Sequence, residues 1–181
     1  ETILQAFAAR CQAEDLTAES RLRMGHPARE ILEQETRTEL LVLGRQGEHA
    51  AWLGDSPGST AERVARSSVK PCLVTPGAFH PIDKLLVAFD GSAHGSKAVH
   101  VAAELALALD VPLSVLTVVT DKDSDAAHRI AQEGAEMARA HRCRTNHLVA
   151  SGRPDEAILS TAREQDFSLI VGGAYGHSRI R

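Results

Sequence analysis

The length, composition and charge of this chain favour one or two small α/β domains and exclude several other classes of protein. Of its 181 residues, 43% are hydrophobic but only 3% are aromatic, so Ala, Val, Leu and Ile must build the core. The formal charge of -4 gives no electrostatic reason to expect nucleic acid as a partner. No apolar run approaches the roughly 20 residues that span a bilayer, and the three cysteines form no C-x-x-C pair. We therefore expect a cytoplasmic protein whose partners include neither membrane nor nucleic acid.

The chain alternates between apolar strands and amphipathic helices. It opens with a predicted helix over residues 2–14 and a predicted strand over residues 20–24. Runs rich in Val, Leu and Ile then predict strands at residues 39–43, 72–75, 84–89, 113–119 and 168–171. Their hydrophobicity is continuous instead of alternating, which is typical of strands that are covered on both faces.

Two helical patterns lie between the later strands. The apolar positions of the first recur with the helical period at Ala98, Val101, Ala102, Leu105 and Leu109. The second carries Ile130, Met137 and Ala138 and ends near His141. Because strands and helices alternate, the predicted fold class is α/β with a parallel sheet.

An internal repeat indicates two copies of one unit. MGHPAREIL, from Met24, reappears as SGRPDEAIL, from Ser151, and ELLVLGRQG reappears as SLIVGGAYG. The two matches are offset by 127 and 129 residues, a period about the size of a small α/β domain.

The two copies are unequally complete. The second copy has elements upstream of its repeat that the first lacks, and the first continues past the point where the second stops. We therefore expect the closing part of one domain at residues 1–78, a Pro-containing linker at residues 79–83, and a second domain at residues 84–181 without its last elements.

These motifs resemble those of the universal stress protein (UspA-like) family in its tandem, two-domain form. The resemblance covers nearly the whole chain and rests on LLVAFDGS at residues 85–92, the two Gly-x-Pro turns, IVGGAYGHSRIR and GSTAERVARSSVKPCLVTP. It implies an open five-stranded parallel sheet with helices on both faces, a Rossmann-like fold of the adenine nucleotide alpha hydrolase type. It also implies that the last strand, at residues 72–75 here, joins domains or subunits.

A glycine-and-hydroxyl array in the first copy suits a phosphate group. Gly44 and Gly47 permit close approach to the backbone after a strand, and Gly58, Ser59 and Thr60 open a helix whose amides and dipole favour an anion. The array lacks the lysine of a Walker loop. It resembles the G-x2-G-x9-G-S/T loop of ATP-binding family members, except that ten residues, 48–57, separate its second and third glycines. Strand-exit turns followed by an ordinary helix cap are the alternative interpretation.

The second copy supplies further candidate residues. Asp90 and Ser92 follow its first strand, where the resemblance implies that the aspartate approaches adenine and ribose; helix capping is the structural alternative. Val119, which ends the next strand, is either an adenine contact or a core residue. Gly173 and Gly176 match the first two glycines of the array, and no closing Gly-Ser pair follows them.

GDSPG at residues 54–58 fits the G-x-S-x-G pattern of a serine hydrolase and gives a remote alternative. A nucleophile elbow uses the N–H of the residue after its serine to form the oxyanion hole, and Pro57, which follows Ser56, has no N–H. A metal site is not expected either, because His141, Cys143 and His147 straddle the end of a helix and the start of a strand.

The resemblance implies a universal stress protein that binds ATP, with AMP or ADP as alternatives and Mg²⁺ as a companion ion. Such a protein acts in the stress response through its conformation or its partners, and its domains pair within the chain or in a homo-oligomer. No catalytic base is evident, so at most slow ATP hydrolysis is expected. The altered loop spacing and the missing second Gly-Ser pair leave open a second hypothesis, a nucleotide-independent dimeric scaffold of the same fold.

Overall fold

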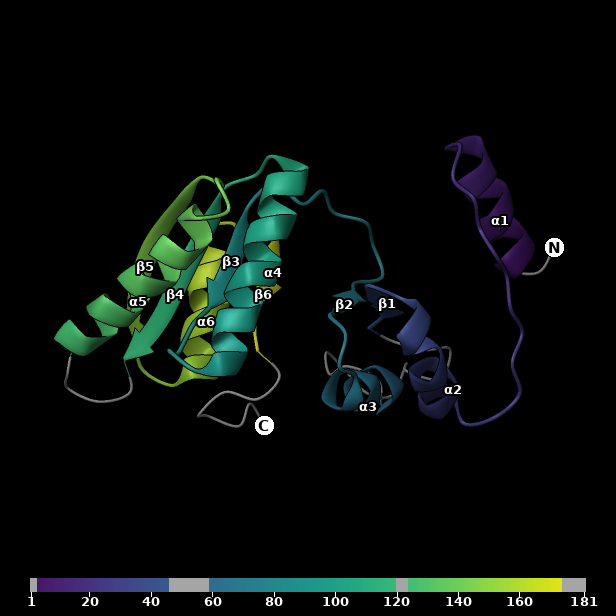
Figure 1. Ribbon diagram of the computed structural model, residues 1–181, viewed down its shortest axis with the longest axis horizontal. Helices are drawn as coiled ribbons and strands as arrows, with labels where there is room; N and C mark the ends of the chain where they lie inside the picture. Colours follow the sequence, from purple (N-terminus) through teal and green to yellow (C-terminus); the bar gives the residue numbers. More distant parts are fainter. Residues whose placement is uncertain (1–2, 46–58, 120–123, 174–181) are drawn as a thin grey trace. The chain divides into compact units, whose positions relative to one another are not determined.

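The chain folds into two compact units, Glu1–Thr75 and Pro76–Arg181. The structure is a computed structural model that describes residues 3–45, 59–119 and 124–173 (Figure 1). The boundary between the units precedes the predicted linker by a few residues. None of the described helices is long and apolar enough to cross a membrane.

The described part of the second unit forms a parallel sheet of four strands in the order β5-β4-β3-β6. Its elements along the chain are β3 (Leu85–Ala88), α4 (Ala93–Leu109), β4 (Leu113–Val119), α5 (Ser124–Arg139), β5 (Thr145–Ser151), α6 (Pro154–Glu164) and β6 (Leu169–Val171). The central strand β3 pairs with β4 on one side and with β6 on the other. The strands predicted at residues 84–89, 113–119 and 168–171 and both helical patterns are confirmed.

Helices cover both faces of this sheet (Figure 1). Leu85 and Val87 of β3 point to one face and pack in a core that includes Ala102 of α4 and Ala135 of α5. Leu86, between them, points to the opposite face and packs in a separate core with α6. This alternation explains why the strands are apolar at successive positions.

The first unit contains a smaller parallel sheet. Its elements are α1 (Ile3–Ala13), α2 (Pro27–Gln34), the 3-10 helix η1 (Glu35–Arg37), β1 (Leu41–Gly44), α3 (Ser59–Ser67) and β2 (Cys72–Thr75). β1 and β2 pair in parallel along their whole length, from Leu41 with Cys72 to Gly44 with Thr75. A core of Ala28, Leu41 and Val64 joins α2, β1 and α3. The predicted helix at residues 2–14 and the predicted strands at residues 39–43 and 72–75 are confirmed, as is the α/β class with parallel sheets.

The strand predicted at residues 20–24 is wrong, because this segment is not a strand in the structure. Its counterpart in the second unit is β5, which pairs with β4. The described part of the first unit has no strand that corresponds to β4, so the segment has no ladder to join. Instead, Arg21 donates a hydrogen bond to Glu19 at 2.8 Å, and this bond together with the charge of Arg21 lowers the pKa of the Glu19 carboxyl.

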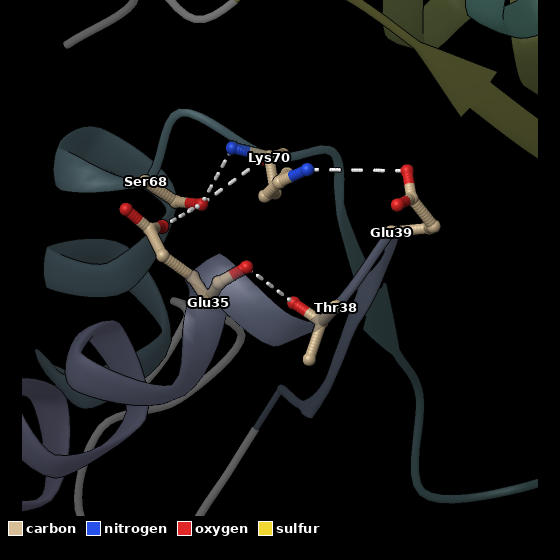
Figure 2. Close-up of polar contacts among 5 residues, drawn as sticks. All are labelled: Glu35, Thr38, Glu39, Ser68 and Lys70. Atoms are coloured by element: carbon tan, nitrogen blue, oxygen red, sulfur yellow. Dashed lines mark hydrogen bonds and ion pairs between the residues drawn. The ribbon is translucent and has the colours of Figure 1, made fainter.

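A cluster of polar contacts joins η1 to the connection between α3 and β2 (Figure 2). Ser68 donates to a carboxylate oxygen of Glu35 at 2.7 Å, and the backbone N–H of Lys70 donates to the Ser68 hydroxyl at 3.0 Å. The Thr38 hydroxyl donates to the carbonyl of Glu35 at 3.0 Å, and the Lys70 ammonium lies 3.9 Å from a carboxylate oxygen of Glu39. These residues precede β1 and β2, so the cluster stabilises the amino ends of the strands and leaves their carboxyl ends to the candidate site.

Candidate functional site

The strongest candidate site lies where β3 ends in the second unit. Ser92 caps α4, because its hydroxyl accepts a hydrogen bond from the N–H of Gly95 at 3.0 Å. Asp90 accepts a hydrogen bond from the N–H of Ser92, also at 3.0 Å, which closes a turn between the strand and the helix. Gly91 occupies the middle of this turn with a φ of 76°, a left-handed conformation that favours glycine. The capping role considered for Ser92 is therefore observed, and the exposed Asp90 is presented at the rim of the turn.

A buried hydroxyl on the neighbouring strand fixes the position of this turn. Thr117 of β4 donates to the carbonyl of Phe89 at 2.9 Å, one residue before Asp90. Thr117 is only 4% exposed, and Phe89 is 3% exposed. The bond extends the β3–β4 connection past the last paired residues and anchors the base of the turn. The sequence analysis did not single out Thr117, although a threonine within the apolar run of residues 113–119 is the signal that could have pointed to this positioning residue.

Gly173 reaches the same turn from the other side, at the exit of β6. A Cβ atom added to Gly173 would lie 3.0 Å from both the carbonyl carbon and the carbonyl oxygen of His94, and 3.2 Å from the nitrogen of Gly95. These are backbone atoms in the first turn of α4, so only a glycine fits without a shift of one segment or the other. The end of β6 and the amino end of α4 are thus in direct contact.

The topology places these residues at the switch point of the sheet. The chain runs from β3 to β4 and β5 on one side, and then crosses over to β6 on the other side of β3. In open parallel sheets, ligands bind at the carboxyl ends of the strands where the strand order reverses. Asp90 follows β3 and Gly173 follows β6, so the two residues flank this point. Val119 lies at the same edge at the end of β4, where it is half-buried and its carbonyl accepts a hydrogen bond from Gly152 at 3.1 Å.

The candidate residues of the first copy belong to the first unit. Gly44 ends β1 and pairs with Thr75, Ser59 is the first residue of α3, and Thr60 follows it in a half-buried position. The structure thus gives each unit its own set of candidate residues. Gly47, Gly58 and Gly176 lie outside the described residues, as does Ser56 of the hydrolase alternative.

A hollow of about 410 Å³ lies elsewhere in the second unit and is unrelated to this edge. It is lined by Leu159, Ala162 and Arg163 of α6 and by Asp166, Phe167 and Ile170 at the entry to β6. In the repeat, Leu159 and Ile170 correspond to Leu32 and Leu41, which pack near Val64 of α3. The hollow therefore corresponds to a surface that α3 covers in the first unit, which accounts for its apolar lining.

The histidines considered for a metal site do not form the cluster that their sequence proximity suggests. Across residues 3–45, 59–119 and 124–173, no group of three or more His, Cys, Asp or Glu side chains converges to hold a metal ion. Cys143 is buried, and its thiol contacts the carbonyl of Ala138 and the hydroxyl of Thr145, each at 3.2 Å. His141 instead meets His100, a partner that lies 41 positions away and that the sequence did not reveal.

Comparison with known proteins identifies the family. The family model described as "Universal stress protein family" matches residues 1–76 and again residues 81–181. Universal stress protein Slr1230 of Synechocystis is 37% identical over 145 residues, which are 79% of this chain and 50% of that protein. The chain therefore spans about half the length of this curated relative.

A solved structure gives the same result for the fold. A universal stress protein from Archaeoglobus fulgidus DSM 4304 is similar over 93% of this chain and 62% of its own length, with a TM-score of 0.73 and 22% sequence identity. The resemblance seen in the sequence motifs is thus confirmed, and two matches in succession agree with a tandem arrangement. Because the family match extends over nearly all of its residues, this chain belongs to the universal stress protein family.

Proposed function

We propose that this protein binds an adenine nucleotide at the carboxyl edge of the second unit and acts in the stress response through conformation or partner binding. The observation that carries the proposal is the junction at the switch point, where Asp90 and Gly173 flank the first turn of α4. An exposed carboxylate at this place is suited to accept hydrogen bonds from the hydroxyls of a ribose or the amino group of an adenine. The tight backbone approach at Gly173 gives the edge a defined shape.

The first unit has its own set of candidate residues, and these suit a phosphate group. Gly44 at the exit of β1 corresponds to Gly173 in the repeat, and the next described helix, α3, begins at Ser59. The amino end of a helix provides unpaired N–H groups and a partial positive charge, both of which favour a phosphate. ATP with Mg²⁺ is the proposed ligand, and at most slow hydrolysis is expected to accompany binding.

The first test is replacement of Asp90 by Asn. Asn keeps a side-chain oxygen that accepts the hydrogen bond from the Ser92 N–H, so the turn is retained while the charge is lost. We expect the affinity for ATP to fall by roughly 10- to 100-fold, which corresponds to a charged hydrogen bond of about 1.5–3 kcal/mol. Equilibrium titration of the intact chain with ATP and Mg²⁺ measures this change, and mass spectrometry of nucleotide released on denaturation identifies a ligand that copurifies.

Asp110→Asn is the matched control for this experiment. Asp110 caps the carboxyl end of α4, at the opposite edge of the sheet, in a left-handed conformation that Asn also tolerates. The same chemical change there should leave the affinity unaltered. If Asp90→Asn and Asp110→Asn bind ATP with equal affinity, Asp90 is not part of the site. If the unaltered chain neither carries nor takes up nucleotide, the scaffold hypothesis replaces the proposal.

A second test uses two adjacent glycines at the exit of β6. A Cβ atom at Gly173 would meet the backbone of α4 at 3.0 Å, whereas a Cβ atom at Gly172 would meet nothing within 4 Å. We expect Gly173→Ala to bind ATP more weakly than Gly172→Ala, because only the former displaces the first turn of α4 or the exit of β6. The two variants should be compared in the same titration, with circular dichroism to confirm that both are folded. Equal affinities in the two folded variants would show that the junction does not shape the site.

A further inference from the structure

Two histidines from different elements meet on the outer side of the second unit. His100 lies on α4 and His141 follows the end of α5. The Nδ1 atom of His100 is 2.8 Å from the Nε2 atom of His141, and the ring centroids are 5.1 Å apart with the rings tilted by 59°. Neither residue belongs to the carboxyl edge described above.

The close packing of α4 against α5 places the two imidazole rings next to each other. Ala103, one turn after His100, and Ala138, one turn before His141, are both 0% exposed and belong to the same core. Small side chains allow α4 and α5 to approach closely, which brings the imidazoles together. The backbone N–H of His141 also donates to the carbonyl of Ala138 at 3.0 Å, so the residue is held to the last turn of its helix.

The separation of the nitrogens fits a shared metal ion as well as a shared proton. Two nitrogens that are each about 2.0 Å from a metal ion lie about 2.8 Å apart at an angle of 90°, and about 3.3 Å apart in a tetrahedron. The observed 2.8 Å equals the spacing of adjacent ligands of a tetragonal ion, so the rings need only turn until both lone pairs point at the ion. A tetrahedral ion requires the rings to separate by about 0.5 Å, a small change for an exposed His100 and a half-buried His141.

We propose that His100 and His141 form a two-histidine site for a divalent transition-metal ion that prefers imidazole ligands. Cu²⁺, Ni²⁺ and Zn²⁺ belong to this class, and Cu²⁺ is expected to bind most tightly. Within the described ranges no third His, Cys, Asp or Glu completes a cluster, and the proposed site therefore has two protein ligands, with water as the proposed occupant of the remaining coordination positions. Bound metal would link α4 to the end of α5 and stabilise the folded second unit.

The test is titration of the untagged, intact chain with Cu²⁺ in a weakly coordinating buffer. We expect His100→Ala and His141→Ala each to bind one Cu²⁺ fewer than the unaltered chain. His128→Ala and His147→Ala are matched controls, because both replace exposed histidines of the same unit, and they should retain the site. Electron paramagnetic resonance of the loaded chain should show two nitrogen ligands, and no more than one in either variant of the pair.

Any other pattern overturns the proposal. The chain contains nine histidines, so binding that is equal in the unaltered chain and in His100→Ala would place the metal elsewhere. Loss of the bound Cu²⁺ in only one of the variants His100→Ala and His141→Ala would also contradict a site formed by both residues. His100→Gln guards against misfolding, because it keeps a polar side chain that can hydrogen-bond but is not an imidazole ligand; a folded His100→Gln variant that retains the site refutes the pair.

Discussion

Replacement of Leu85 by Ala is expected to destabilise the second unit by about 3–5 kcal/mol. Leu85 is 0% exposed and lies on the central strand, where it pairs with Leu113 and Leu169 on either side. The truncation removes buried apolar surface and leaves a cavity between the sheet and the helices of the larger core, which the paired strands cannot close by moving.

Leu107→Ala is the matched control for Leu85→Ala. Leu107 lies on α4 and is 54% exposed, so the same truncation there should change the free energy of unfolding by less than about 1 kcal/mol. Denaturant unfolding monitored by hydrogen exchange measures the stability of each unit separately. This is necessary because two units can unfold independently. The prediction requires faster exchange within β3 and β4 of Leu85→Ala. Equal stability of the two variants would mean that Leu85 does not lie in a closely packed core.

Replacement of Gly134 by Ala should destabilise the same unit, although Ala normally stabilises the middle of a helix by up to about 1 kcal/mol relative to Gly. A Cβ atom at Gly134 would lie 2.5 Å from Cδ1 of Phe89 and 2.9 Å from Cγ1 of Val115. Both side chains are buried, so neither can rotate out into solvent. We expect a net loss of about 1–2 kcal/mol, because the cost of overpacking exceeds the gain in helix propensity.

Glu133→Ala serves as the control for Gly134→Ala, since its neighbouring position on α5 is exposed and should tolerate Ala. Thermal or denaturant unfolding measures both variants. The Gly134→Ala variant should also bind ATP less well if the proposed site is correct, because Phe89 directly precedes Asp90 and its ring must shift. If Gly134→Ala instead raises the stability by up to about 1 kcal/mol, as the replacement of Gly by Ala does elsewhere in a helix, Gly134 is not closely packed against Phe89 and Val115.

Elements that depend on local interactions are predictable from this sequence, and elements that depend on distant partners are not. The strand predicted at residues 113–119 has the same bounds as β4. A strand that is covered on both faces needs apolar residues at successive positions, and such a run is visible in the local sequence. The segment at residues 20–24 resembles β5 in its place before the repeat, but a strand also needs a neighbour. The neighbour of β5 is β4, which lies more than 25 residues earlier in the chain, and the local pattern carries no information on whether such a strand is available.

The candidate site follows the same rule. Asp90 and Ser92, which are close in sequence, were identified as candidates from their place after a strand, and the family resemblance identified Gly173 as a further candidate. The contacts that hold the site together were not identified, because Thr117, His94 and Gly173 come from elements far apart in the sequence. The pairing of His100 with His141 depends on how closely two helices pack, which single-sequence periodicity does not determine. Gly134 in the middle of a predicted helix is a signal that the prediction did not use, since a glycine there indicates a close approach.

The pairing of β3 with two strands has a consequence for the order of folding. Leu85 pairs with Leu113 of β4 and with Leu169 of β6, so attaching β6 closes a loop about three times as long. This costs about 1 kcal/mol more in chain entropy, and the β3–β4 pair is therefore expected to form first. The candidate site needs both the turn after β3 and the exit of β6, so it is completed only in the last step. A ligand bound there would stabilise the attachment of β6, the strand whose pairing with β3 costs more chain entropy.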